Sequence, residues 1–528
     1  MLGGGKFQTQ NKLLVGSYIN FVSAKDASIN ISDRGYVAVA LDLDWGADGM
    51  IELTTESFQK DAKKLLGYDY THENMKPLRE IFKNATVAYV YRLNGANGVK
   101  ASNAYATAKY AGVRGNDIGI LVETNVDDDA KFDVYTLVDG VKVDKQIVAK
   151  YDELKSNDYV DFNKSGVTLT PKTQPEYLTG GANGGAGAYA SNAYATAKEA
   201  GAKGNQLYIM ITPSDGSTKA QVSICFDDGG DGGIYETFTV DSVMSLNTTD
   251  NDYVTFHFTE EVSTPITEYL TGGADGGNPN EPHVAFLALA ESYAFNTLVC
   301  NSNDATIIDL YIAYTKRMRD EVGVKFQTVV YDDEANYEGI INFATAVIDE
   351  NVPAHYGVFW VAGASAGCEI NKTNTNKKYD GEYKFELNAT KTELEDAIKS
   401  GKFVFHRVGD ETRVLVDINS LVEYDMEKGS DFSDNKTIRI LDQIGNDVAL
   451  EFNTNFLGKI PNDAAGRISF WNALDNCGKK LQNLRAIQEW DNTLLKISEG
   501  ETKTSVVVDM VVNVVGTMEK LYMTVRVV

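Results

Sequence analysis

A nine-residue sequence, ASNAYATAK, occurs twice in this chain, at 101–109 and again at 190–198. Two further landmarks repeat in the same order: NDYV at 157 and 251, and EYLTGGANGG at 176, which returns as EYLTGGADGG at 268. The offsets are nearly constant, at 190 − 101 = 89, 251 − 157 = 94 and 268 − 176 = 92 residues. This predicts a tandem duplication of a small domain, because an array of stacked repeats needs at least about three copies to bury a continuous core.

The duplication also predicts where the domains lie. With about 150 residues per domain as a guide, a chain of 528 residues should hold three or four domains. Two of them are the copies, at 95–185 and 186–277. Each contains short apolar segments, such as IGILVET and FDVYTLVDG, between Gly, Asn and Asp turns, which is typical of β-rich modules. We expect ASNAYATAK, with the AGVRGN or AGAKGN that follows it, to form a short helix or turn ahead of the first strand.

The parts that flank the copies mix helices and strands. In 1–94, TTESFQKDAKKLLG predicts a helix capped by Thr54 or Thr55, with Gly67 just past its end. In 278–419, helical and strand patterns alternate, and we interpret YGVFWVAG as one of the strands. Alternation of this kind predicts a parallel α/β layer.

The last part, 420–528, is predicted to contain a long helix and two terminal strands. Just before it, Thr390 and Glu393 fit a capping box at the start of another helix. The long helix runs from about 463 to 490 and has an apolar stripe at helical spacing. The stripe consists of Ile468, Trp471, Leu474, Leu481, Leu484 and Ile487. The two strands are SVVVDMVVNVV and LYMTVRVV.

Charge and cysteine content argue against several partners and sites. A formal net charge of −26 argues against nucleic acid or an anionic membrane as the main partner. Residues 95–185 carry 10 Lys and Arg against 13 Asp and Glu, whereas 186–277 carry 3 against 13. The four cysteines stand far apart, which predicts free buried thiols. The first residues hold no apolar run long enough for a signal peptide, so we expect folding in a cytoplasm.

One string has the form of a catalytic motif. GASAG at 363–367 matches the nucleophile elbow G-x-S-x-G, with Ser365 as the nucleophile. The stretch that follows, CEINKTNTNKKYDGE, lacks the apolar period of the helix that the motif requires, and only His406 lies downstream as a base. We therefore interpret GASAG as a turn that ends a strand.

Other motifs for catalysis, cofactors or metals are not supported. Each GK pair lacks the Ser or Thr that a phosphate-binding loop requires. The Asp run at 127–129 and DDGGDGG at 227 lack calcium-loop spacing, which favours solvated turns. We assign no catalytic, cofactor-binding or metal-binding residue.

Short stretches along nearly the whole chain resemble the contractile tail sheath proteins of phages and phage-derived particles. Near the start these are SYINF, DLDWG, LLGYD and YRLNG, and in the first copy ATAKYAGVRGND. Further on they are KRMRDEVGVKFQTVV, WVAGASAG, DFSDNKTIRILDQI and FLGKIPNDAAGRISFWN. Their number and their common order make the resemblance specific, although the second copy departs from the usual family pattern.

The resemblance implies an α/β and β multidomain protein. Its α/β core domain would be built from N- and C-terminal parts, with a subtilisin-like portion, and would carry two tandem-duplicated β-rich insertion domains facing outward. The implied division is an N-terminal sheath domain and arm, two insertion modules, an α/β sheath domain, and a C-terminal sheath domain with a terminal strand. The boundaries are 1–94, 95–185, 186–277, 278–419 and 420–528.

The resemblance also implies a structural function in a virion or phage-tail-like particle, assembled in the host cytoplasm. Subunits would form stacked rings, hexameric in this family, around a tail tube and contract to drive the tube into a cell. The implied partners are further copies of the chain, the tube protein, and baseplate and terminator proteins. No enzyme activity, nucleotide, direct nucleic-acid contact or membrane insertion is implied.

Both ends of the chain are candidates for arms that link subunits. In LYMTVRVV, four apolar side chains alternate with Tyr522, Thr524 and Arg526, which predicts a strand lying on a core. Such a strand could pair within its own subunit or, as the resemblance implies, complete a sheet in a neighbour. The arm candidates are Tyr18, Ile19, Phe21, Leu521, Met523, Val525 and Val527.

Three further expectations remain open. Lys479, Lys480 and Arg485 on the long helix could face the tube, or they could be a solvated helix surface. A hydrolase that uses Ser365 is one rival function. The other is an adhesive or carbohydrate-binding protein that works through the duplicated modules.

Overall fold

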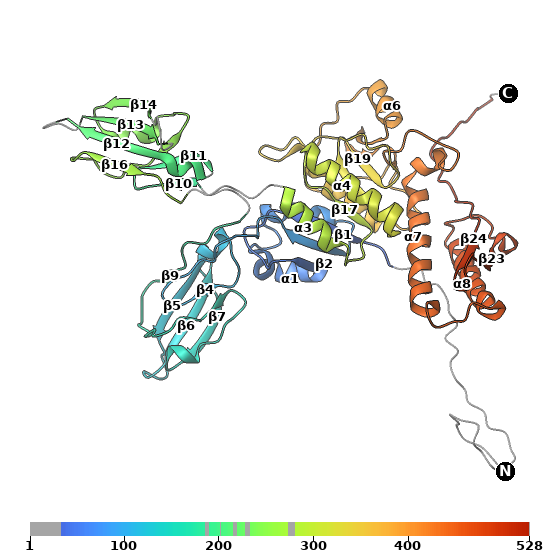
Figure 1. Ribbon diagram of the computed structural model, residues 1–528, viewed down its shortest axis with the longest axis horizontal. Helices are drawn as coiled ribbons and strands as arrows, with labels where there is room; N and C mark the ends of the chain where they lie inside the picture. Colours follow the sequence, from blue (N-terminus) through green and yellow to red (C-terminus); the bar gives the residue numbers. More distant parts are fainter. Residues whose placement is uncertain are drawn as a thin grey trace, which may run out of the picture.

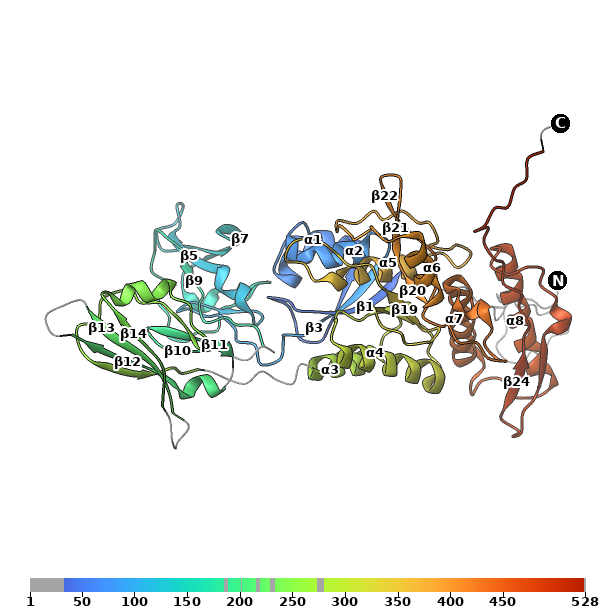
Figure 2. The ribbon, with the colours of Figure 1, turned by 90° about the horizontal axis from the view of Figure 1, so that it is seen from above.

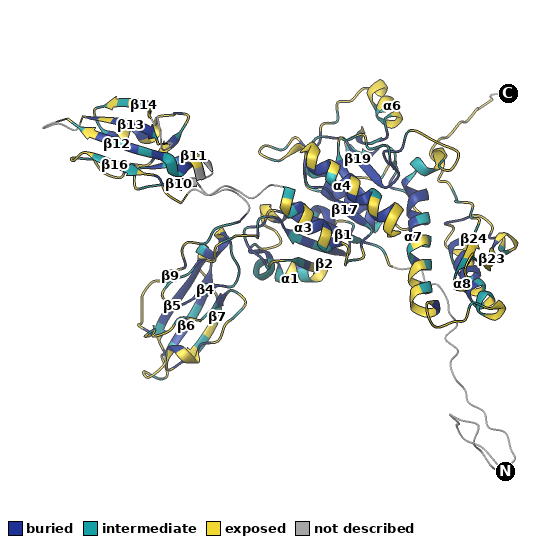
Figure 3. Cartoon of the chain, in the orientation of Figure 1, coloured by how far each residue is buried: buried dark blue, intermediate teal, exposed yellow. Residues whose placement is uncertain are grey.

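The computed structural model describes residues 33–184, 189–200, 202–214, 219–227, 233–272 and 280–526. Its units follow one another along the long axis (Figure 1): two β modules lie at one end, an α/β unit lies in the middle, and a mainly helical C-terminal unit lies at the other end. The view from above shows the same order (Figure 2). Buried residues are concentrated inside each unit (Figure 3), so each packs around its own apolar interior.

A seven-stranded sheet forms the middle unit. In spatial order its strands are β2 (Met50–Thr54), β3 (Val87–Arg92), β1 (Tyr36–Leu41), β17 (Thr297–Val299), β18 (Gln327–Tyr331), β19 (Ile340–Phe343) and β20 (Lys402–Phe403). Neighbouring strands run parallel, except that β2 is antiparallel to β3. The expected parallel layer is confirmed. Because β1 pairs with both β3 and β17, strands from before and after the β modules share one sheet.

Helices cover both faces of this sheet. On one face lie α1 (Thr55–Leu66), α2 (Lys76–Phe82) and α5 (Val358–Gly367); on the other lie α3 (Asn280–Ala290) and α4 (Ala305–Arg317). A single π-helical turn, Met318–Val322, extends α4. In β1, Val37 and Val39 pack toward α5, whereas Ala38 and Ala40 pack toward α3 and α4. Burial on both faces explains why β1 is apolar throughout.

Two predicted helix caps are confirmed. Thr54 caps α1, because its side chain accepts a hydrogen bond from Ser57 N, and Gly67 ends the helix with φ at 86°. Thr390 and Glu393 form the capping box of α6 (Lys391–Lys399).

The prediction that YGVFWVAG is a strand that ends in a turn is wrong. Residues 358–367 form α5, and all but the last of them are buried. A helix that is apolar on every side cannot be distinguished by periodicity from a buried strand. Its small residues allow close packing on α2: a Cβ on Gly363 would stand 2.4 Å from Ile81 O, and one on Gly367 would stand 1.9 Å from Asn84 O.

The two β modules lie between β3 and α3 in the chain. The first has a four-stranded sheet of β7 (Val141–Val148), β6 (Phe132–Val138), β5 (Ile118–Thr124) and β9 (Glu176–Tyr177), and a pair of β4 (Thr107–Ala108) with β8 (Val160–Asp161). The second has a four-stranded sheet of β14 (Gly233–Val240), β13 (Ala220–Phe226), β12 (Leu207–Pro213) and β16 (Ile266–Tyr269), and a three-stranded one of β10 (Tyr189–Ser191), β11 (Ala195–Ala200) and β15 (Val254–Phe256). The two four-stranded sheets have the same strand order.

The repeated ASNAYATAK forms strands and a turn, not a helix. In the first copy, Asn103 Oδ1 accepts hydrogen bonds from the backbone N of Tyr105 and Ala106, each at 2.9 Å. In the second copy, Asn192 holds the same turn at the same distances. An Asn side chain that bonds its own backbone two residues on favours turns over helices. Short 3-10 helices follow, as expected, at Val113–Asp117 and Ala202–Gln206.

The C-terminal unit contains α7 (Asn435–Glu451), α8 (Ala464–Asn483) and the hairpin of β23 (Lys496–Glu499) and β24 (Val506–Asp509). A π-helical turn, Phe452–Phe456, ends α7. The predicted helix to about 490 is too long, because α8 ends at Asn483 and Arg485 adopts a left-handed φ of 58°. Of the predicted stripe, Leu474 and Leu481 are buried but Ile468 is 61% exposed.

The remaining elements are short. A second hairpin joins β21 (Phe405–Val408) and β22 (Glu411–Val414). Further 3-10 turns lie at Glu73–Met75, Tyr151–Glu153, Val243–Thr248, Ala354–Gly357, Ser430–Ser433 and Asn492–Leu494.

The contact between α5 and α2 can be tested with paired glycine substitutions. Gly367→Ala should destabilise the protein by about 1–3 kcal/mol, because its Cβ would overlap the backbone of Asn84, just after the end of α2. Gly445→Ala on α7 is the control, since its Cβ would meet only Lys325 Cγ at 3.6 Å. That variant should gain about 0.5–1 kcal/mol from helix propensity. Denaturant unfolding followed by circular dichroism measures both, and equal stabilities would contradict the close crossing.

Candidate functional site

Buried charges on α7 attach the C-terminal unit to the α/β unit. Arg439 donates to Asp417 at 2.9 Å, and both side chains are 1% exposed. One turn further along α7, Asp442 accepts two hydrogen bonds from Arg319, at 2.6 and 2.8 Å. The buried Asn435 also donates to Asp417, at 2.9 Å. The orientation of α7 is therefore set by directional contacts.

Asp417 stays ionised in this environment. Its burial alone would raise the pKa, but the charge of Arg439 and the hydrogen bond from Asn374 N lower the pKa below its usual value. A carboxylate with a lowered pKa in the folded protein stabilises it above the unfolded pKa and loses that effect as the pH falls. The attachment of α7 should therefore weaken only in acid.

Beyond α8, the hairpin of β23 and β24 has two open edges. Within the described residues, each of these strands pairs only with the other. The chain after β24 returns past the end of α8: Gln488 N donates to Asn513 O at 2.8 Å, and Val515 N donates to Ala486 O at 3.0 Å. Open strand edges present unpaired N–H and C=O groups that can accept a strand from another chain.

The last described part of the chain extends away from the body of the protein (Figures 1 and 2). Glu519 accepts a hydrogen bond from Thr375 Oγ1 at 3.0 Å. Past this point Leu521, Met523 and Val525 are 85%, 73% and 72% exposed. The predicted strand LYMTVRVV is not formed within the subunit over residues 521–526. Exposed apolar runs of this kind are typical of surfaces that bind another molecule.

The other predicted arm residues lie outside the described part of the chain. These are Tyr18, Ile19, Phe21 and Val527.

The three predicted tube-facing residues do not share one helix face. Lys479 lies on α8 and pairs with Asp475 at 2.6 Å. Lys480 lies on the same helix, whereas Arg485 comes after its end. Asp475 is buried and also accepts from Trp490 Nε1 at 2.9 Å. Lys479 therefore has a structural partner in its own unit.

Ser365 is not placed as a nucleophile. It lies in the middle of a buried helix and is 3% exposed. Its carbonyl oxygen accepts a hydrogen bond from Arg34 at 3.3 Å, which fixes the end of α5. The interpretation as a strand-to-helix elbow fails because no strand precedes the serine. All four cysteines are free and buried, as predicted.

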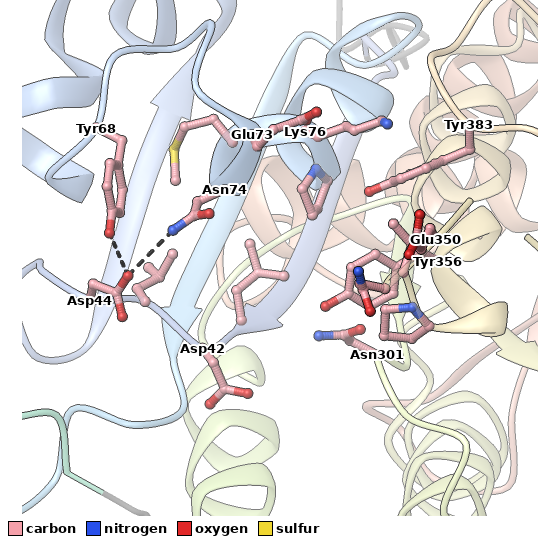
Figure 4. A pocket seen from close by; sticks show the side chains of 17 residues that line it. Asp42, Asp44, Tyr68, Glu73, Asn74, Lys76, Asn301, Glu350, Tyr356 and Tyr383 are labelled. Atoms are coloured by element: carbon pink, nitrogen blue, oxygen red, sulfur yellow. Dashed lines mark hydrogen bonds between the residues drawn. The ribbon is translucent and has the colours of Figure 1, made fainter. Parts of the chain in front are cut away.

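Sequence reasoning missed a pocket of 390 Å³ at the carboxyl ends of β1 and β17 (Figure 4). In the sheet, β3 lies on one side of β1 and β17 on the other, so the order in which the chain adds strands reverses at β1. Ligands often bind at such a point in an α/β sheet. In this pocket, however, the carboxylate of Asp44 is already hydrogen-bonded. Asp44 accepts from Tyr68 at 2.6 Å, from Asn74 at 3.3 Å and from Asn183 of the first β module at 2.8 Å. DLDWG matches no ligand motif, so only the fold identifies this position.

The same region holds the first β module against the α/β unit. Asn183 Oδ1 accepts from Arg92 at 3.2 Å while its Nδ2 donates to Asp44. Arg114 Nε donates to Gly67 O at 2.9 Å. Trp45 is 1% exposed and packs in the core of the module. Apolar burial and a polar network therefore fix this module in place.

Among the described residues, no group of three or more His, Cys, Asp and Glu side chains is placed to hold a metal ion. No helix in the described part is long and apolar enough to cross a membrane.

Breaking the pair of Arg439 with Asp417 should release α7. Arg439→Met leaves a buried carboxylate without its cation and should cost about 3–5 kcal/mol of stability. Arg439→Met with Asp417→Asn removes both charges, keeps an amide oxygen that can accept from Asn374 N and Asn435, and should recover most of that loss. Thermal unfolding monitors both variants. If the single and double variants were equally unstable, the ion pair would not be what fixes α7.

Four consecutive parts of the chain match models of phage tail sheath domains. The N-terminal region of domain III of tail sheath protein Gp18 matches residues 34–93, and the phage tail sheath protein β-sandwich domain matches 95–183. The phage tail sheath protein central domain matches 276–420, and the phage tail sheath C-terminal domain matches 427–528.

The chain is also similar over its full length to individual relatives and solved structures. The chain is 29% identical to protein XkdK of the phage-like element PBSX of Bacillus subtilis (strain 168), over 100% of both chains. It is similar to the crystal structure of a sheath tail protein from Desulfitobacterium hafniense, at 26% identity and a TM-score of 0.65, over 97% of this chain and 100% of that one. A sheath tail protein from Listeria innocua gives 28% identity and a TM-score of 0.66, over 95% and 97%. The chain belongs to the phage tail sheath protein family and is a component of a phage tail or tail-like particle.

Proposed function

We propose that this subunit polymerises as stacked hexameric rings around a tail tube, and that the sheath contracts to drive the tube through the envelope of a target cell. The tube, baseplate and tail terminator proteins are its partners in this scheme. Contraction is a change between two arrangements of the same subunit surfaces, so it needs no nucleotide and no catalytic residue. The observation that carries the proposal is the combination, in one subunit, of an exposed terminal segment and a hairpin with open edges.

The terminal segment acts as a strand donated to a neighbouring subunit. Leu521, Met523 and Val525 project to one side in an extended chain, and all three are highly exposed in the single subunit. The hairpin of β23 and β24 offers unpaired edges, and a two-stranded sheet alone is only marginally stable. If the terminal segment adds as a strand to an edge of this hairpin, the unpaired backbone groups of both become hydrogen-bonded and the exposed apolar side chains become buried.

The energy of this contact is sufficient to link subunits. Each backbone hydrogen bond contributes about 0.5–1.5 kcal/mol net. Burial of apolar side chains adds about 25 cal/mol per Å². One arm therefore contributes several kcal/mol, and the lattice repeats the contact at every subunit. The N-terminal candidates Tyr18, Ile19 and Phe21, and Val527 at the other end, complete the proposed arms.

The rest of the chain follows from this role. The α/β unit and the C-terminal unit form the sheath wall, with a subtilisin-like portion in 278–419. The segments 95–185 and 186–277 arose by duplication and face outward. The equal strand order of their four-stranded sheets supports a common origin. An outward module touches few neighbouring subunits, so an extra copy disturbs assembly little.

Removal of the terminal arm should block polymerisation without unfolding the subunit. We expect truncation before Leu521 to give a soluble monomer with near-native circular dichroism, because these side chains make no core in their own subunit. Sedimentation velocity and negative-stain electron microscopy measure the outcome. Normal sheaths from the truncated protein would exclude the arm as the link.

Point variants give a matched control for the same experiment. Aspartate at Leu521, Met523 and Val525 changes the proposed core-facing side and should abolish assembly. Aspartate at Tyr522 and Thr524 changes the opposite side of the same segment and should leave assembly largely intact. Equal loss in both variants would indicate a general charge effect.

Deletion of 186–277 should leave a protein that folds and assembles. The cut rejoins equivalent Gly-rich sequences, LTGGANGG and LTGGADGG. Deletion of 95–185 is the contrast, because it would expose Trp45 and remove the partners of Arg92 and Asp44. Electron microscopy for tubes, with circular dichroism for folding, tests both. A folded protein without 186–277 that forms no tubes would make the second module part of the lattice.

A further inference from the structure

The four-stranded sheets of the two modules can be compared position by position, because their registers match. In the first module, Gly119 pairs with Leu137, and Leu137 with Lys142. In the second, Tyr208 pairs with Cys225, and Cys225 with Ile234. Both sheets carry a register shift at this row. These residues lie on the outer face, since the neighbouring Ile120 and Ile209 point into the module cores.

The outer face of the first module is charged. Lys142 stands 3.4 Å from the ring centroid of Tyr135 and pairs with Glu123 at 3.4 Å. Lys145 pairs with Asp133 at 2.9 Å and also approaches the ring of Tyr135, at 5.5 Å. Paired charges of this kind keep a sheet face solvated and discourage other molecules from docking on it.

Every one of these charges is replaced by a neutral side chain at the matching position of the second module. By register, the replacements are Glu123 by Thr212, Asp133 by Gln221, Lys142 by Ile234 and Lys145 by Thr237. Yet residues 186–277 as a whole carry 3 Lys and Arg against 13 Asp and Glu. The four matched positions are therefore neutral although the module as a whole is acidic.

Threonine, glutamine and isoleucine side chains take the place of the charges, and one aromatic ring is added. Tyr208 stands where the first module has Gly119, and its ring lies 4.9 Å from that of Tyr269 at an interplanar angle of 35°. Tyr269 is 43% exposed and donates its hydroxyl to Asp227 at 2.8 Å. Beside the rings, the hydroxyls of Ser223 and Thr237 are 2.9 Å apart.

We propose that this outer face, built on β14, β13, β12 and β16, binds a neutral polysaccharide. The carbon–hydrogen side of a sugar ring packs on the two tyrosine rings, as apolar surface does on aromatic side chains. Sugar hydroxyls exchange hydrogen bonds with the exposed side chains of Thr212, Gln221 and Thr237, each of which can donate and accept. The acidic remainder of the module repels anionic polymers, which favours an uncharged ligand.

The face is mixed in character. The two rings stand among the exposed Thr212, Gln221 and Thr237, and Ile234 is 58% exposed. The binding surface goes beyond sheath assembly and does not depend on it. The sheet belongs to the module at the end of the long axis farthest from the C-terminal unit (Figure 1), where a large polymer has access.

Affinity electrophoresis of the full chain tests the proposal. Native gels would contain dextran, amylose, mannan or hydroxyethyl cellulose, with the anionic hyaluronate as the contrast. We expect at least one neutral polymer to retard the protein and hyaluronate to have no effect. Tyr208→Ala with Tyr269→Ala should abolish the retardation.

Tyr177→Ala is the matched control, because Tyr177 holds the position of Tyr269 in the first module and is also 43% exposed. This variant should migrate like the parent protein. Circular dichroism confirms that each variant is folded, and sheath formation is scored separately by electron microscopy. The proposal is overturned if no neutral polymer retards the parent, if the tyrosine pair is dispensable, or if the pair is needed for self-association instead.

Discussion

The buried charges of α7 are the contact on which the rest of the subunit depends. Arg439 and Asp417, with Arg319 and Asp442, join the C-terminal unit to the α/β unit without exposure to water. Removal of one partner from a buried ion pair is strongly destabilising, and the contacts here are directional hydrogen bonds. The hairpin and the terminal segment are therefore presented at a defined angle to the central sheet.

A second polar network gives the first β module a fixed position, and the second module has lost the corresponding residues. Arg114 bonds Gly67 O, whereas the matching residue of the second copy is Lys203. Asn183 joins Asp44 to Arg92, whereas the matching residue is Asp275, outside the described residues. Lysine lacks the planar fork of arginine, and aspartate cannot donate to a carboxylate. The two modules keep the same strand order in their four-stranded sheets, while the side chains that attach the first module differ in the second.

The sequence predicted most of the architecture where local signals agree with the fold. Helix caps at Thr54 and Thr390 are short-range chemistry, so the structure confirms them. Alternating helix and strand patterns predict the parallel layer correctly. They do not identify α5 as a helix, because a helix that is buried on all sides has no polar face and therefore no hydrophobic periodicity. The end of α8 was misplaced because Leu484 and Ile487 continue the apolar pattern after the left-handed Arg485 has ended the helix.

The candidate site was predicted less well, for a physical reason. The alternation in LYMTVRVV identifies a strand, but a pattern cannot say which chain supplies its partner, and in the subunit the segment is exposed. Lys479 was chosen for its charge, whereas its contact with Asp475 depends on where the buried Trp490 lies. The pocket beside Asp44 was missed because its walls come from segments far apart in the sequence: the end of β1, residues 68–77, Asn301 after β17, residues 350–356 and Tyr383.

The central claim, that the terminal segment joins one subunit to the next, is tested most directly by a cryo-electron microscopy map of the polymer. The account predicts that residues 518–526 lie as a strand against an open edge of β23 or β24 in a neighbouring subunit, with Leu521, Met523 and Val525 buried. A map in which this segment folds back on its own subunit, and the hairpin edges stay unpaired, would contradict it.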